Sequence, residues 1–146
     1  MTDIVDTKTR SRMMAGIKGK DTLPELLVRR YLHAQGFRYR LHDKKLPGSP
    51  DIVLARHHLA IFVNGCFWHR HIGCKYATTP AQNRAQWLKK FSQNVARDKK
   101  QIQFLIDHGW RVLVIWECGL NSPTPDLRWL PAFIKTNREF YTDWPQ

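Results

Sequence analysis

The segment DIVLARHHLAIFVNG, residues 51–65, contains two apolar runs separated by the polar residues RHH at 56–58. Two runs of β-forming residues on either side of a short polar segment are typical of a β-hairpin. We therefore expect residues 51–55 and 59–65 to form neighbouring antiparallel strands. This pair predicts a β-sheet, to which the segments before and after it contribute.

The sequence before the hairpin predicts one helix and one further strand. Residues 21–36 begin with polar capping residues, place leucines near one helical face and stop at a glycine, as amphipathic helices do. Residues 37–42, FRYRLH, alternate aromatic and basic side chains at the strand period. Residues 9–20 indicate a short basic helix that is interrupted at Gly19.

The sequence after the hairpin predicts two helices and a buried strand. Apolar residues recur near helical spacing from Pro80 to His108, with a break expected before Asp98. Residues 110–117, WRVLVIWE, form a nearly continuous apolar run that suits a central buried strand beside the hairpin. A last helix is expected within residues 127–140. The expected fold class is therefore α/β (α+β), a mixed β-sheet flanked by helices.

The length of 146 residues fits one domain. We expect an N-terminal arm over residues 1–20, a core over residues 21–120 and a C-terminal appendix over residues 121–146. No apolar run has the length of a signal-peptide core or of a membrane span. The expectation is a soluble protein inside the cell.

Charge and cysteine content narrow the class of partner. Lys and Arg outnumber Asp and Glu by 24 to 12, and the isoelectric point is near 10.1. Such an excess favours a polyanionic partner, nucleic acid before a membrane surface. Three cysteines cannot all pair in disulfides and would stay reduced in a cytosol, which makes metal ligation their leading use.

The spacing Cys66-x4-His71-x2-Cys74, with Cys118 at the end of the predicted central strand, predicts a metal site. Four such ligands with no open position are typical of structural zinc, which does not activate water. Two alternatives stay open: the cysteines could be small buried residues, or His69 could replace His71 as the ligand. If His71 is the ligand, a fixed zinc loop would hold His69 at one angle, as a general acid or base must be.

Two carboxylates are candidates for catalysis. Asp51 stands at the start of a predicted strand, where its oxygens would suit Mg²⁺, although an aspartate after Pro50 can equally cap a turn. Glu25 follows Thr22 by three residues, which is the spacing of a capping box, so its ordinary role would be to stabilise a helix start.

Three aromatic residues, Phe67, Trp68 and Trp87, are candidates for contact with DNA. Aromatic side chains among basic residues can wedge between base steps while Lys and Arg hold the phosphates. Core packing is the alternative for each, and Trp87 lies on the apolar face of its predicted helix.

Five ordered segments resemble the very-short-patch mismatch repair endonucleases. They are TRSRMMAGIKGKDTLPE, LPGSPDIVL, IFVNGCFWHRHIGC, QWLKKFSQNVARD and GWRVLVIWEC, and together they span roughly residues 8–120. The resemblance implies a fold similar to type II restriction endonucleases. It also implies an enzyme that nicks one strand 5′ of the thymine in a T:G mismatch, the product of 5-methylcytosine deamination, in an Mg²⁺-dependent reaction.

The resemblance implies a role for each catalytic candidate. Asp51 would bind Mg²⁺, His69 would activate the attacking water, and Glu25 would support the active site. Restriction-type nucleases normally carry an acidic residue and a lysine on the strand after the first aspartate, but residues 61–65, IFVNG, supply neither. The main-chain carbonyl of Val63 would then complete the Mg²⁺ shell, and His69 would replace the lysine.

The resemblance further implies a structural zinc held by Cys66, His71, Cys74 and Cys118. Three aromatic residues would insert into the DNA base stack near the mismatch: Phe67, Trp68 and Trp87. The N-terminal helix around Met14 would clamp the DNA from the opposite groove. Some relatives carry a histidine at the position of Asn64. We therefore assign Asn64 no role in proton transfer and group it with the DNA-binding residues. Gly73 lengthens the loop before the second cysteine compared with some relatives, which a small adjustment would absorb.

A zinc-stabilised DNA-binding module without catalysis is the main alternative function, and a zinc hydrolase is another. The endonuclease interpretation implies double-stranded DNA with a T:G mismatch as the partner, with other mismatch-repair proteins as further candidates. It implies no membrane partner, a monomeric chain, and a location in the bacterial cytoplasm with the nucleoid.

Overall fold

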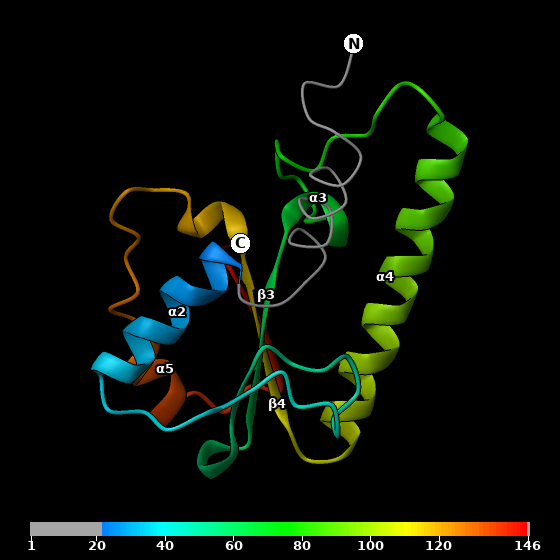
Figure 1. The fold of residues 1–146 in the computed structure, drawn as a ribbon. Helices are drawn as coiled ribbons and strands as arrows, with labels where there is room; N and C mark the ends of the chain where they lie inside the picture. Colours follow the sequence, from blue (N-terminus) through cyan, green and yellow to red (C-terminus); the bar gives the residue numbers. More distant parts are fainter. Residues whose placement is uncertain (1–21, 146) are drawn as a thin grey trace, which may run out of the picture.

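The centre of the molecule is a five-stranded mixed β-sheet with the order β1-β2-β3-β4-β5 (Figure 1). This computed structural model describes residues 22–145. The strands are β1 (Arg40–Leu41), β2 (Ile52–Leu54), β3 (Leu59–Asn64), β4 (Arg111–Trp116) and β5 (Tyr141–Trp144). β2 runs antiparallel to both of its neighbours, β1 and β3, whereas β3, β4 and β5 run parallel to one another.

Helices cover both faces of this sheet. They are α2 (Leu23–Ala34), the short α3 (Cys66–His69), α4 (Arg84–Asp107) and α5 (Leu130–Thr136), with 3-10 turns η1 (Ala55–His57) and η2 (Glu117–Leu120). In Figure 1, α2 and α5 lie on one side of the sheet and α4 lies on the other. The predicted class, a mixed sheet flanked by helices, is confirmed.

The alternation of side chains along β3 and β4 builds two cores. Leu59 and Ile61 of β3 belong to the cluster under α2 and α5, whereas Ala60 faces the cluster under α4. In β4, Leu113 joins the first cluster and Val112 the second. All five of these side chains are almost fully buried. Burying a leucine or isoleucine contributes about 1.5–3 kcal/mol, so the sheet is a rigid base for the loops at its ends.

The predicted hairpin is confirmed. Ile52 pairs with Ile61 and Leu54 with Leu59 in the antiparallel register of β2 and β3. His58, with φ +50°, takes the left-handed conformation at the turn. The predicted central strand is also confirmed, since β4 lies between β3 and β5.

The break expected before Asp98 is wrong, because α4 continues from Arg84 to Asp107. Aspartate can end a helix by bonding to nearby backbone groups. The Asp98 carboxylate instead accepts a hydrogen bond from the ring of His69, at 2.7 Å. The helix also begins later than Pro80, after Asn83 in a left-handed conformation.

The C-terminal segment differs from the predicted single helix. Helix α5 ends at Thr136, and β5 then adds a parallel strand beside β4. Arg111 explains part of this path, because its guanidinium donates to the carbonyl oxygens of Ile134 and Asn137 at 3.0 and 2.7 Å. Tertiary contacts of this kind override local helix preference.

Other expectations are met in part or lie outside the described residues. The strand expected over residues 37–42 is reduced to the two residues of β1. The basic helix expected within residues 9–20, and Met14 with it, lies outside the described range. Among residues 22–145, no helix has the length and apolar character needed to cross a membrane.

Candidate metal centres and active site

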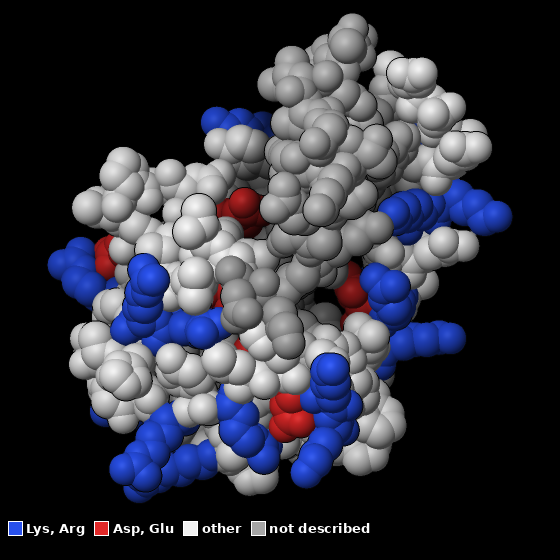
Figure 2. Space-filling view, viewed as in Figure 1, with Lys and Arg blue, Asp and Glu red and all other residues white. Residues whose placement is uncertain are grey.

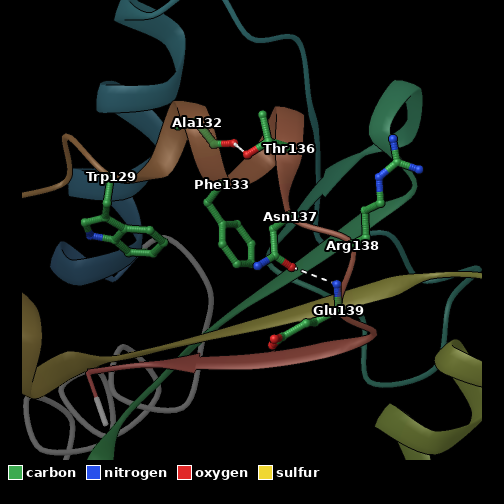
Figure 3. Close-up of a pocket in the computed structure, with 7 residues that line it drawn as sticks. All are labelled: Trp129, Ala132, Phe133, Thr136, Asn137, Arg138 and Glu139. Atoms are coloured by element: carbon green, nitrogen blue, oxygen red, sulfur yellow. Dashed lines mark hydrogen bonds between the residues drawn. The ribbon is translucent and has the colours of Figure 1, made fainter.

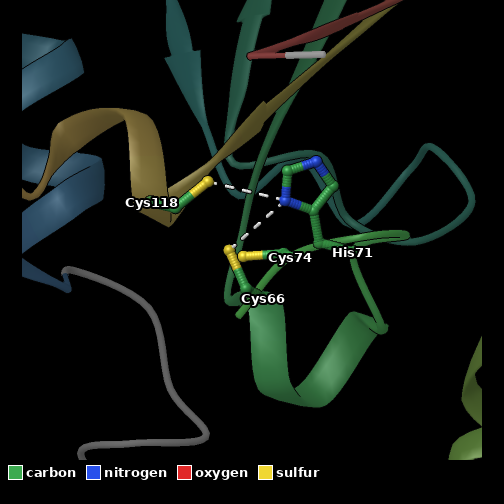
Figure 4. Close-up of side chains that lie close together, drawn as sticks. All are labelled: Cys66, His71, Cys74 and Cys118. Atoms are coloured by element: carbon green, nitrogen blue, oxygen red, sulfur yellow. Dashed lines mark hydrogen bonds between the residues drawn. The ribbon is translucent and has the colours of Figure 1, made fainter. Parts of the chain in front are cut away.

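Four predicted ligands meet at one point, which we call the Cys/His cluster: Cys66, His71, Cys74 and Cys118 (Figure 4). Their ligand atoms all lie within 4.8 Å of one another. Nδ1 of His71 is 3.7 Å from Sγ of Cys66 and 3.5 Å from Sγ of Cys118. The cluster could hold a metal ion, and it would join the loop after β3 to the end of β4.

Local backbone turns bring these ligands together. Cys66 opens α3, and the helix ends at Arg70, which has a left-handed φ of +58°. The N–H of His71 then donates to the carbonyl of Cys66 at 3.1 Å. Gly73 has a left-handed φ of +73° and stands next to a 94% exposed Ile72, so this part of the loop lies in solvent.

Burial keeps the Cys66 thiol protonated when no cation is bound. Burial raises the pKa of the Cys66 thiol to about 12. A bound dication would reverse this effect, because it holds a coordinating sulfur as the thiolate. The ring of His71 stacks on Trp116 with centroids 4.3 Å apart and an interplanar angle of 9°. This packing fixes the imidazole with Nδ1 toward the sulfurs.

A second group, the carboxylate cluster, consists of Glu25, His42 and Asp51. Glu25 comes from the first turn of α2, His42 follows β1, and Asp51 precedes β2. One ligand atom from each lies within 4.8 Å of the others. The predicted acidic candidates therefore do meet, together with a histidine that the sequence analysis did not identify.

Asp51 is held by the sheet in a buried environment. The backbone N–H of Val63 donates to Oδ2 of Asp51 at 2.8 Å. Burial raises the pKa of Asp51 to about 7; the Val63 hydrogen bond opposes this rise and the nearby Glu25 carboxylate adds to it. Two carboxylates placed this close repel each other when both are charged, so the arrangement favours a bound cation.

Glu25 lies at the start of α2, as a capping residue would, but its carboxylate also bonds to His42 and Arg29. The Thr22 half of the predicted capping box is present, since the hydroxyl of Thr22 accepts from the N–H of Glu25 at 3.4 Å. The Glu25 carboxylate is 2% exposed and bonds at 2.9 Å to both Nε2 of His42 and Nη1 of Arg29. Its oxygens thus face the carboxylate cluster.

His69 lies outside the Cys/His cluster, at the end of α3. Its Nδ1 is 2.7 Å from Oδ2 of Asp98 on α4. The side chains of His69 and Asp98 are 30% and 21% exposed, so the pair is accessible to a substrate. A carboxylate on one ring nitrogen fixes the ring and leaves the other nitrogen for proton transfer.

The predicted DNA-binding aromatics form a preassembled group, the aromatic platform: Phe67, Trp68, Trp87 and Phe91. The Phe67 ring centroid lies 5.0–5.6 Å from those of its three partners. Phe91 is 4% exposed and anchors the platform, while the other three are half-buried. Edge-to-face contacts of this kind add stability beyond area burial, so the exposed edges are held in place.

Arg70 secures the aromatic platform. Its guanidinium lies 3.9 Å from the centroid of Phe91 and donates to the carbonyl oxygens of Phe67, Ala77 and Thr78. Asn64, the remaining predicted DNA contact, is the last residue of β3 and is 9% exposed.

Four residues of these sites were not predicted as site residues from the sequence: His42, Arg70, Phe91 and Asp98. Phe91 had a signal in the helical periodicity, which places it one turn after Trp87. The sequence pattern predicts a helix break before Asp98 and gives no sign of its contact with His69. Nothing in the sequence near His42 indicates its contact with Glu25, because 17 residues separate them.

The cavities of the described residues lie apart from these clusters. A cavity of about 710 Å³ beside α5 is lined by Trp129, Ala132, Phe133, Thr136, Asn137, Arg138 and Glu139 (Figure 3). Another, of about 870 Å³, is lined by residues 35–40 and parts of β2, η1 and α5. Neither cavity is lined by a member of the Cys/His or carboxylate cluster. The candidate site is therefore identified from side chains that lie close together and not from a cavity.

A mixed sheet carrying paired carboxylates and a carboxylate-bound histidine, on a strongly basic chain, fits an enzyme of the DNA endonuclease class. Residues 2–75 match the family model described as DNA mismatch endonuclease Vsr. The chain belongs to this family. Of the function classes left open by the sequence, family membership selects the enzyme over the non-catalytic module.

Individual relatives agree with this assignment. The chain is 45% identical to a type II nicking enzyme of Neisseria meningitidis, over 84% of this chain and 86% of the relative. It is 44% identical to a type II nicking enzyme of Xanthomonas oryzae, over 84% and 89%. It is 42% identical to the DNA mismatch endonuclease Vsr of Escherichia coli, over 84% and 78%.

Proposed function

We propose that this endonuclease nicks one strand of duplex DNA 5′ of the thymine in a T:G mismatch left by deamination of 5-methylcytosine. The observation that carries the proposal is the composition of α3. Within four residues this helix supplies Cys66 to the Cys/His cluster, Phe67 and Trp68 to the aromatic platform, and His69 to the pair with Asp98. One rigid turn thus couples recognition to cleavage.

The chemistry we propose is hydrolysis of a phosphodiester by water. Asp98 holds Nδ1 of His69, so Nε2 is the nitrogen that takes a proton from the attacking water. Asp51 and the main-chain carbonyl of Val63 would hold Mg²⁺, a fit supported by the buried carboxylate oxygens of the cluster. The bond from phosphorus to the 3′ oxygen breaks as water attacks, and the 3′ oxygen leaves and is protonated to a hydroxyl. When bound, Mg²⁺ would neutralise the charge that develops on the phosphate and on this leaving oxygen. Glu25 supports Asp51 from α2.

We propose zinc as the ion of the Cys/His cluster. Tetrahedral zinc, with bonds of about 2.3 Å to sulfur and about 2.1 Å to nitrogen, holds such ligands about 3.6 Å apart. The measured separations of 3.7 and 3.5 Å from Nδ1 of His71 match this spacing. With four protein ligands the ion would pin α3 to the end of β4 and would take no part in hydrolysis.

Recognition of the mismatch would come from the aromatic platform. Inserting the rings of Phe67, Trp68 and Trp87 unstacks base steps at a cost of about a few kcal/mol, which is lower at a wobble pair than at a matched pair. Lys and Arg side chains gather along the lower and right margins of the face in Figure 2 and would hold phosphates. Met14 in the N-terminal arm would clamp the opposite groove.

The proposed setting is a monomer acting on the bacterial chromosome in the cytoplasm, where other mismatch-repair proteins are candidate partners. One chain contributes every residue of both clusters, so neither cluster needs a residue from a second copy.

The test uses end-labelled duplexes that are identical except for one T:G or C:G pair, with Mg²⁺ or with EDTA. We expect a single nick 5′ of the thymine, in the T:G duplex and with Mg²⁺ only. Asp51→Ala should bind the T:G duplex and fail to nick it, whereas the surface variant Asp126→Ala should nick normally. Equal cleavage of the C:G duplex, or cleavage in EDTA, would contradict the proposal.

A further inference from the structure

His42 bonds to both acidic residues of the carboxylate cluster, to Glu25 through its side chain and to Asp51 through its backbone. Its Nε2 lies 2.9 Å from each oxygen of the Glu25 carboxylate. Its backbone N–H donates to the main-chain carbonyl of Asp51 at 3.1 Å. His42 therefore connects α2 to the chain segment that enters β2.

The backbone at His42 is in a conformation that needs support. In the register of β1 and β2, Leu41 pairs with Ile52, so the next residue, His42, lies opposite Asp51. His42 has a left-handed φ of +48°. A residue with a Cβ pays about 1 kcal/mol or more for this conformation. The bonds to Glu25 and Asp51 are contacts that offset this cost.

Arg29 and His42 hold the Glu25 carboxylate from different elements. Arg29 bonds to Glu25 at 2.9 Å and lies one turn further along the same helix. That ion pair orients the Glu25 carboxylate within α2. His42, whose side chain is 15% exposed, reaches the same carboxylate from the sheet side.

We propose that His42 is a positioning residue that fixes the Glu25 carboxylate relative to Asp51 by donating Nε2–H to it. The inference rests on the proposed role of the carboxylate cluster in Mg²⁺-dependent nicking. Groups that orient the carboxylates of a metal site typically change activity about 10–100-fold when they are removed.

Two substitutions separate the hydrogen bond from the backbone. In His42→Gln the side-chain amide nitrogen reaches the place where Nε2 stands, whereas in His42→Asn it falls one carbon short. Asparagine tolerates the left-handed backbone at least as well as histidine does. A loss seen only in His42→Asn therefore reports the missing bond to Glu25. His33→Asn, at an exposed position in the last turn of α2, is the matched control.

The assay measures single-turnover nicking of the T:G duplex at saturating protein, alongside duplex affinity in Ca²⁺ and thermal unfolding. We expect His42→Asn to nick about 10–100-fold more slowly, with duplex affinity within about twofold of wild type because no DNA contact is lost. His42→Gln and His33→Asn should keep the wild-type rate.

Two results would overturn the inference while wild type still nicks. A normal rate in His42→Asn would show that the bond to Glu25 is dispensable, and an equal loss in both His42 variants would assign the imidazole another role. If wild type fails to nick, the proposed function fails instead.

A measurement without turnover tests the same bond. In Mg²⁺-free protein, the long-range ¹H–¹⁵N spectrum of the imidazoles should show a proton on Nε2 of His42. That signal should shift in Glu25→Gln and stay unchanged in the surface variant Asp107→Asn. An Nε2 without a proton would overturn the proposal.

Discussion

The Cys/His cluster and the carboxylate cluster are built from the same sheet but differ in how their members are held. The ligands of the Cys/His cluster come from two segments, residues 66–74 and Cys118, and converge on Nδ1 of His71. The carboxylate cluster joins α2, the end of β1 and the start of β2 through hydrogen bonds to Glu25 and Val63. The first is closed by its own ligands, whereas the second leaves carboxylate oxygens for a substrate-bound ion.

This difference separates stability from activity. Loss of the Cys/His cluster should release α3 and the residues it carries, because coordination by Cys66 and Cys118 would tie α3 to the end of β4. Loss of charge in the carboxylate cluster should spare the fold, because two neighbouring buried carboxylates repel each other.

The largest effect is expected from emptying the Cys/His cluster. Removing the proposed zinc with a strong chelator, or replacing Cys118 by Ser, should abolish the cooperative thermal unfolding transition of the domain. Structural zinc contributes about 10 kcal/mol or more to folding in small zinc domains. Circular dichroism melts with and without added zinc provide the measurement. An unchanged melting curve after complete zinc removal would show that the sheet is stable without the ion.

A smaller effect, confined to activity, is expected for Asp51→Asn. The nicking rate should fall about 10³-fold, which corresponds to about 4 kcal/mol of lost charge stabilisation. Stability should stay equal or rise, because Asn still accepts the Val63 hydrogen bond and no longer repels Glu25. Urea unfolding and single-turnover nicking are compared with Asp126→Asn as control. A large loss of stability would contradict the proposed separation.

A smaller loss of nicking activity is expected for Asp98→Asn. This variant removes the charge that holds Nδ1 of His69, and nicking should fall about 100-fold, in the range of general acid–base contributions. Binding of the T:G duplex and zinc content should not change. Asp107→Asn is the matched control, because Asp107 is an exposed aspartate on the same helix. Wild-type nicking by Asp98→Asn would remove His69 from proton transfer.

Much of the fold was predictable because its signals are local. The hairpin of β2 and β3 and the strand β4 follow from apolar runs bounded by turn residues. Strand β5 was missed because its pairing depends on β4 and on Arg111, which is distant in sequence. The expected break at Asp98 failed for a related reason, since a contact with His69 outweighs the capping preference of aspartate.

The sites divide in the same way. The Cys/His cluster was predictable because three of its four members lie within nine residues, so spacing limits their geometry. The carboxylate cluster was only half predictable. Asp51 and Glu25 had structural alternatives, and their link through His42 depends on the register of β1 and β2. Sequence spacing does not carry register information over such a distance.

The smallest effect is expected for Thr22→Ala, which tests the two roles of the Thr22–Glu25 pair separately. The Thr22 hydroxyl accepts a long hydrogen bond of 3.4 Å from the N–H of Glu25, so its loss should cost about 0.5–1 kcal/mol of unfolding free energy. Nicking should not change, because the Glu25 carboxylate is oriented by His42 and Arg29. Urea unfolding of Thr22→Ala and Thr22→Ser measures the cost of the cap. Slower nicking by Thr22→Ala at unchanged stability would contradict this, because it would show that the hydroxyl acts in the active site and contributes nothing as a helix cap.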